Sequence, residues 1–148
     1  MKKILISSAF ALAAFAGSAS AHEVMATVES AGKAGRGIAI DIVSDGGIAG
    51  FSFRIEVPGI NEKTANVKGC TAKLVGFTGE CAVSKGGINV IASANAPATT
   101  IQKGVVSVGE IYFTTSDAKA AGGIQITGAE FSDNSGNSTA GTAKVVQN

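Results

Sequence analysis

Residues 47–59, GIAGFSFRIEVPG, contain the most regular alternation of apolar and polar side chains in the chain. A period of two residues is typical of a β-strand with one buried face and one solvent-exposed face. A Pro-Gly pair ends the run, as expected for a strand followed by a turn. The stretch therefore predicts a two-faced strand. Its buried positions are Phe51, Phe53, Ile55 and Val57, and its exposed positions are Ser52, Arg54 and Glu56.

Similar strand-like runs recur along the chain at intervals of about ten residues, separated by Gly, Asn, Asp and Pro. The stronger runs are 23–30, 37–45, 87–94, 103–117 and 122–133; the weaker ones are 70–75, 80–84 and the C-terminal segment 139–148. Only residues 116–123 have a composition that favours a helix, and this segment is short enough to be a turn. Eight or nine short strands predict an all-β, antiparallel sandwich or barrel in one domain.

The phase of each run predicts the core. Inward positions are Val24, Ala26, Val28, Ile38, Ile40, Ile42, Phe51, Phe53, Ile111, Phe113, Ile124 and Ile126. Glu110, Tyr112 and Thr114 take the opposite, solvent-exposed phase. Tyr112 is the one aromatic residue with a clearly outward phase. A surface that binds crystalline polysaccharide usually needs several exposed aromatic rings, so this pattern weakens such an interpretation.

The first residues have the pattern of a secretory signal peptide. Lys2 and Lys3 precede an apolar run, and the small residues 19–21 form an A-x-A cleavage pattern. The run is short for a membrane span, which needs about 20 apolar residues. We therefore expect cleavage after Ala21, a signal peptide over residues 1–21, a single domain over residues 22–148, and a secreted or periplasmic protein that is not embedded in a membrane.

Removal of the signal peptide leaves ten basic side chains against eleven acidic ones, a net charge of −1. A nearly neutral chain without a basic cluster argues against nucleic acid as a partner. Cys70 and Cys81 both lie in the exported part of the sequence, where an even number of thiols favours a disulfide. We expect this bond to be structural and to hold the intervening turn, residues 73–80.

Catalytic and metal-binding motifs are incomplete. His22 is the single histidine, so it lacks the second imidazole that a copper site at the N-terminus would need. The acids at the strand faces and turns, Asp41, Asp45, Glu56 and Glu110, have the phase of solvated surface groups rather than of a glycosidase pair. Residues 133–138, DNSGNS, begin like a calcium loop but have Lys144 at the position of the final glutamate, so an Asx turn explains them better. We predict no catalytic residues, no metal and no cofactor.

Two longer blocks carry a family resemblance. They are IDIVSDGGIAGFSFRIEVPG, residues 40–59, and VGEIYFTTSDAKAAGGIQITGAEFSDNSG, residues 108–136. Their strand and turn pattern, in this order, resembles that of cohesin domains over nearly the whole predicted mature chain. The resemblance implies a nine-stranded jelly-roll sandwich without catalytic activity. It also implies that a partner docks on the outer face of one flat sheet.

Matching strand by strand, the resemblance implies that the ligand-binding face contains Arg54, Glu56, Asn89, Ile91, Glu110 and Tyr112. Ile91 and Tyr112 would anchor the partner, and the charged groups would set its register. An equally weighted alternative is that Arg54 and the glutamates form cross-strand ion pairs that keep an ordinary sheet soluble.

Two functions follow as expectations. The first is an exported, non-enzymatic binding or adhesion module that recognises a protein, such as a dockerin-like partner, or an extracellular or cell-surface polysaccharide. The alternative is a structural matrix component that self-associates through its sheet edges.

Overall fold

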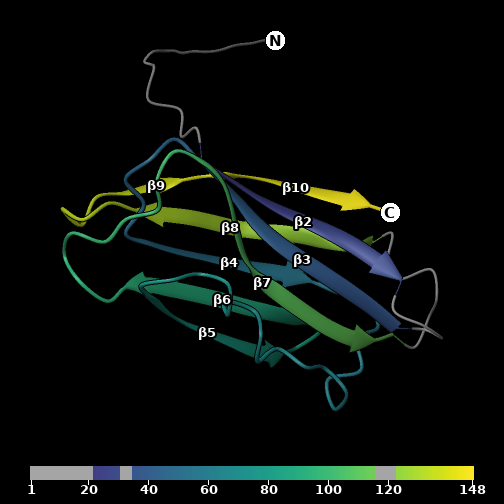
Figure 1. The fold of residues 1–148 in the computed structure, drawn as a ribbon. Helices are drawn as coiled ribbons and strands as arrows, with labels where there is room; N and C mark the ends of the chain where they lie inside the picture. Colours follow the sequence, from purple (N-terminus) through teal and green to yellow (C-terminus); the bar gives the residue numbers. More distant parts are fainter. Residues whose placement is uncertain (1–21, 31–34, 116–122) are drawn as a thin grey trace, which may run out of the picture.

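The computed structural model describes residues 22–30, 35–115 and 123–148, which form two facing β-sheets (Figure 1). The predicted signal segment, residues 1–21, and most of the predicted turn at 116–123 lie outside the described residues. The four-stranded sheet contains β2 (Glu23–Ser30), β3 (Gly35–Ser44), β7 (Gly104–Thr114) and β10 (Thr142–Gln147). The five-stranded sheet contains β4 (Gly50–Glu56), β5 (Phe77–Ser84), β6 (Gly87–Ala94), β8 (Gln125–Ser132) and β9 (Ser138–Ala140).

The strand order is β10-β2-β3-β7 in one sheet and β5-β6-β4-β8-β9 in the other. These nine strands confirm the predicted all-β sandwich. The expectation of a purely antiparallel fold is wrong, because β10 runs parallel to β2. Among the described residues, no helix is long and apolar enough to cross a membrane.

The parallel pair arises from the way the chain changes sheets near its C-terminus. Only Gly141 separates β9 from β10, so the chain continues in one direction while it crosses from one sheet to the other. A Cβ atom at Gly141 would lie 2.1 Å from Cε2 of Phe131, so glycine is required for this close crossing. The amide of Gly141 donates to the carbonyl of Ala129 (2.9 Å), which holds the crossing against β8.

The core lies between the two sheets and confirms the predicted phases. The predicted inward side chains of β2, β3, β4 and β7 are all buried, and β6 adds Ile88, Val90 and Ala92. In β8 the alternation changes phase at Gly128, which has a φ of +64°. Ile124 is buried and Ile126 half-buried before this point, whereas Ala129 and Phe131 point inward after it. The glycine therefore acts as a bulge that re-aims the second half of the strand.

The free edge of β7 is covered by the segment of residues 60–73, which we call the covering segment. Asn66 exchanges two backbone hydrogen bonds with Tyr112, and the amide of Glu110 donates to the carbonyl of Gly69 (2.9 Å). At Gly109 an added Cβ atom would lie 2.1 Å from the Gly69 oxygen, so the approach requires a glycine. Covering an edge in this way removes a row of backbone groups that could pair with another chain.

Residues 70–75 were predicted as a weak strand, and this prediction is wrong. The amide of Cys70 donates to the carbonyl of Val67, and that of Leu74 donates to the carbonyl of Thr71, so these residues form consecutive turns. The weak candidate at residues 80–84 lies in β5, and the C-terminal one at 139–148 contains β10 and the end of β9, so both are confirmed.

A disulfide joins Cys70 to Cys81, as predicted, with the two Cα atoms 6.5 Å apart. Cys70 belongs to the covering segment on β7, and Cys81 lies on β5, the edge strand of the other sheet. The disulfide therefore ties the two sheets together along one side of the sandwich. The crossing at Gly141 closes the opposite side.

Candidate functional site

The outer face of the five-stranded sheet brings four of the six predicted binding residues together. The strand registers place Asn89 of β6 opposite Arg54 of β4, and Ile91 opposite Ser52. Glu56 follows Arg54 on the same face of β4. We call the solvent-exposed side chains of β5, β6, β4 and β8 the outer face.

Arg54 is fixed by internal hydrogen bonds rather than being free for a ligand. Its Nε donates to Glu56 Oε1 (2.6 Å), and its Nη1 donates to Asn89 Oδ1 (3.2 Å). Its Nη2 donates to the carbonyls of Ser84 and Lys85 in the β5–β6 hairpin. The guanidinium thus organises the face and the hairpin. The alternative expected cross-strand ion pairs, but the ion pair of Arg54 with Glu56 lies within β4, and its cross-strand side-chain partner is the neutral Asn89.

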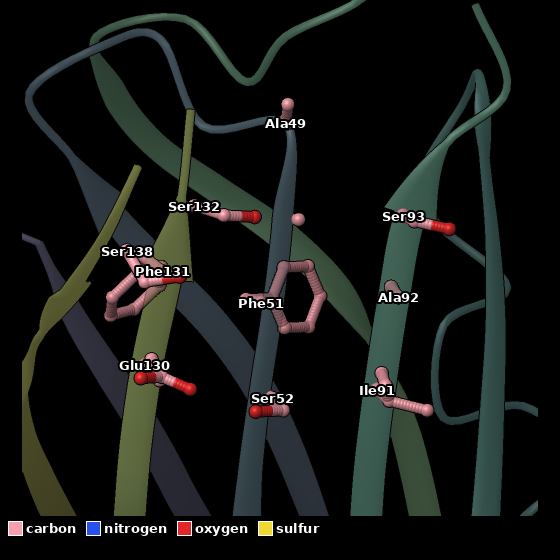
Figure 2. A pocket seen from close by; sticks show the side chains of 11 residues that line it. Ala49, Phe51, Ser52, Ile91, Ala92, Ser93, Glu130, Phe131, Ser132 and Ser138 are labelled. Atoms are coloured by element: carbon pink, nitrogen blue, oxygen red, sulfur yellow. The ribbon is translucent and has the colours of Figure 1, made fainter. Parts of the chain in front are cut away.

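Ile91 is the exposed apolar side chain of this face. It is 56% exposed, although it lies near the centre of the sheet on β6. Beside it is a shallow hollow of about 250 Å³ between β6, β4 and β8. Figure 2 shows Glu130, Ser52 and Ile91 in one row across these strands, with Ser132 and Ser93 in a second row two residues further along. A side chain at Gly50 would fill this second row, because its Cβ would lie 2.8 Å from Ser132 Oγ.

Two predicted binding residues, Glu110 and Tyr112, do not belong to this face. Both lie on β7, which pairs with β3 in the four-stranded sheet. The strand beside β4 is β8, which places Thr127 opposite Arg54 and Glu130 opposite Ser52. The alternation of β7 correctly predicts that Glu110 and Tyr112 point outward, but alternation carries no information on which sheet a strand joins.

Glu110 and Tyr112 instead form a polar cluster with Lys73 of the covering segment. Nζ of Lys73 lies 2.5 Å from Oε2 of Glu110, and the Tyr112 hydroxyl donates to Oε1 (2.5 Å). The Lys73 hydrogen bond, followed by that from Tyr112, holds the pKa of Glu110 below its usual value. The same contact with Glu110 raises the pKa of Lys73 and that of Tyr112. This cluster fastens the covering segment to β7.

The cluster can be tested by titrating Glu110. Because the pKa of Glu110 is lower in the folded state, its ionised carboxylate favours folding at pH values above the unfolded-state pKa. This contribution is lost as the pH falls through the folded-state pKa. We expect Lys73→Met to move the carboxyl titration of Glu110, followed by NMR, upward toward its usual midpoint. Lys68→Met removes a charge from the same segment and should leave the midpoint unchanged. Equal midpoints in the wild type and Lys73→Met would contradict the assignment.

The remaining candidate residues have structural partners. The Nδ1 atom of His22 accepts a hydrogen bond from the amide of Asp45 (3.1 Å), and its ring lies 5.2 Å from that of Phe131. The Asp133 carboxylate accepts hydrogen bonds from the backbone amides of Ser135 and Asn137, which form the Asx turn expected for residues 133–138. The hydrogen bond from the Asn137 side chain is the main cause of the lowered pKa of Asp133. Within the described ranges, no group of three or more His, Cys, Asp or Glu side chains is placed to hold a metal ion.

Two acids of the outer face were missed by the sequence reasoning, Glu80 on β5 and Glu130 on β8. The register places Glu80 directly opposite Ile91 of β6. It places Glu130 opposite Ser52 of β4. The alternation of side chains along β5 predicts that Glu80 points outward. The outward direction of Glu130 can be predicted only if the bulge at Gly128 is taken into account.

The sequence matches no protein-family model and no curated protein. The fold, by contrast, matches solved structures of cohesins. A non-cellulosomal cohesin from the hyperthermophilic archaeon Archaeoglobus fulgidus is 12% identical, with a TM-score of 0.56 over 85% of this chain and 87% of that chain. The second type II cohesin module from the adaptor ScaA scaffoldin of Acetivibrio cellulolyticus is 13% identical, with a TM-score of 0.58 over 86% and 88%.

A third match is the sixth cohesin from scaffoldin B of Acetivibrio cellulolyticus, whose structure contains a Cel5 dockerin mutant. It is 15% identical, with a TM-score of 0.56 over 86% of this chain and 99% of that chain. The alignments cover most of each chain, so the similarity extends to the sandwich as a whole. The protein therefore has a cohesin-like fold, as the two sequence blocks had indicated.

Proposed function

We propose that the protein is an exported, non-catalytic module that binds a protein partner through the outer face of the five-stranded sheet. The observation that carries the proposal is Ile91, an aliphatic side chain 56% exposed near the centre of a polar sheet face. Its neighbours are held in place, because Arg54 is hydrogen-bonded to Glu56, Asn89 and the β5–β6 hairpin. A fixed polar frame around an apolar anchor is typical of protein interfaces.

The fold similarity supports a protein partner. Two of the similar cohesins were solved in complexes with dockerins, so sandwiches of this shape can serve as protein receptors. The aromatic residues also favour protein over polysaccharide. Phe51, Phe53 and Phe131 are buried between the sheets, and the half-exposed Tyr112 lies on the opposite sheet. Among the described residues, the outer face therefore offers a sugar no exposed ring on which to stack.

Export is the part of the proposal that rests chiefly on the sequence. The lysine-led apolar run and the A-x-A pattern predict cleavage after Ala21. The first strand, β2, begins at Glu23, so a mature chain that starts at His22 retains every strand of the sandwich. A disulfide between Cys70 and Cys81 is also typical of an oxidising compartment. Intact mass of the exported protein should correspond to a chain starting at His22, and a mass that includes residues 1–21 would contradict cleavage.

The binding face can be tested with two matched substitutions. The immobilised wild-type protein would capture the partner, and the affinity of that partner for purified variants would then be measured. We expect Ile91→Asp to weaken binding by about tenfold or more, since loss of an interface anchor costs roughly 2 kcal/mol. Val105→Asp is the control, because Val105 is 65% exposed on β7 of the opposite sheet. If Val105→Asp weakened binding and Ile91→Asp did not, the partner would bind the other sheet.

A further inference from the structure

The charges around Ile91 carry information about its partner. Across the sheet, the register gives the row Glu80, Ile91, Ser52, Glu130. Both glutamates are exposed, and neither takes part in the ion pairs found among the described residues, which use Glu56, Glu110 and Asp45. Neighbouring strands are about 5 Å apart, so the two acids flank the anchor at about one and two strand spacings.

Within the part of the chain that the structure describes, no basic side chain forms an ion pair with either of them. Arg54 directs its donors to Glu56, Asn89 and two hairpin carbonyls. Glu56 is in turn occupied by Arg54, so this pair contributes little net charge. The face therefore presents two unpaired carboxylates on either side of an exposed apolar side chain, which repels phosphate and favours a cationic ligand.

The lining of the hollow beside Ile91 also suits a cationic side chain. The strand backbone at Gly50 and Phe51 lines it, Ile91 borders it, and its rim carries the hydroxyls of Ser52 and Ser132 and the carboxylate of Glu130 (Figure 2). A long basic side chain fits this arrangement, because its aliphatic stem can lie along the exposed Ile91 while its charged end stays at the polar rim beside Glu130. A purely apolar side chain would leave the carboxylate at the rim without a partner.

We propose that the segment docked on this face places a Lys or Arg side chain in the hollow, with its charge at Glu130, next to an apolar residue on Ile91. This inference rests on the proposed function, because it specifies the chemistry of the protein partner at that site. A second basic residue of the partner would face Glu80. Such a partner differs from a nucleic acid or an anionic membrane, both of which the two carboxylates repel.

The test uses a phage-displayed random peptide library, selected on the purified protein, and one synthetic peptide made from the enriched consensus. We expect enriched peptides to contain Lys or Arg within a few positions of an apolar residue. The double variant E80Q/E130Q should bind the synthetic peptide about fivefold to tenfold more weakly, as expected for the loss of two exposed ion pairs. The control E23Q/E29Q removes the same charge from β2 in the other sheet and should leave the affinity unchanged.

The outcomes separate the inference from the proposed function. If I91D abolishes binding while E80Q/E130Q and replacement of the peptide's basic residues by Gln leave affinity unchanged, the face binds peptides but the inference is wrong. If binding survives I91D, the proposed face itself is wrong. Thermal melting of each variant shows that lost binding does not reflect unfolding. It is expected to match the wild type closely, because all the altered side chains are exposed except Glu23, which is half-buried.

Discussion

Replacing Phe131 by alanine is expected to lower the free energy of unfolding by about 3–5 kcal/mol, the range for a buried phenylalanine. Phe131 is 2% exposed, and its ring lies 5.2 Å from that of His22 and 6.5 Å from that of Phe51. It also lies directly against Gly141, where the chain crosses between the sheets. The ring thus joins the start of the described chain, the centre of the five-stranded sheet and the C-terminal crossing.

Chemical denaturation of the purified variant measures this loss. A domain of this size has about 5–15 kcal/mol of stability in total, so Phe131→Ala should be marginally folded. Phe77→Ala is the matched control, because Phe77 lies on edge strand β5 and is only half-buried. Its loss should be clearly smaller. Equal losses for the two variants would mean that the closure around Phe131 does not hold the sandwich together.

Replacing Cys70 and Cys81 together by alanine should lower the free energy of unfolding by about 2–3 kcal/mol while the fold persists. The disulfide closes a short loop and ties the covering segment to β5, but most of the apolar core lies elsewhere between the sheets. Amide hydrogen exchange should therefore speed up locally at Asn66 and Glu110, whose amides bond across the edge of β7. The amides that pair β2 with β3, in the middle of that sheet, provide the internal control.

Two results would contradict this account of the disulfide. Titration that finds two free thiols in the native exported protein would show that the bond does not form. A uniform rise in exchange throughout both sheets would show that the disulfide stabilises the whole molecule rather than the covered edge.

Much of the fold could be predicted because the strands are two-faced. In β4, Phe51, Phe53 and Ile55 alternate with polar residues, and all three are buried. A period of two is a direct consequence of strand geometry, so the sequence alone reveals which side chains enter the core. The bulge at Gly128 breaks this period, which is why the inward phase of Phe131 could not be read from the first half of its strand.

The partners of each strand could not be predicted in the same way. Alternation is identical for a strand in either sheet, and Glu110 and Tyr112 were consequently placed beside β4 although β7 pairs with β3. The parallel pairing of β10 with β2 also depends on the crossing at Gly141, a long-range contact with Phe131. The predicted adjacency of β4 and β6 is therefore confirmed, whereas the strands that flank this pair are β5 and β8, which carry Glu80 and Glu130.

The most direct test of the proposed binding face is methyl NMR of the protein with its captured partner. The methyl signals of Ile91 should shift or broaden on addition of the partner, because Ile91 is exposed on β6, next to the central strand β4 of the outer face. Those of Val105, on the opposite sheet, should remain unchanged. Perturbation of Val105 with an unchanged Ile91 would contradict the account and would place the partner on the four-stranded sheet.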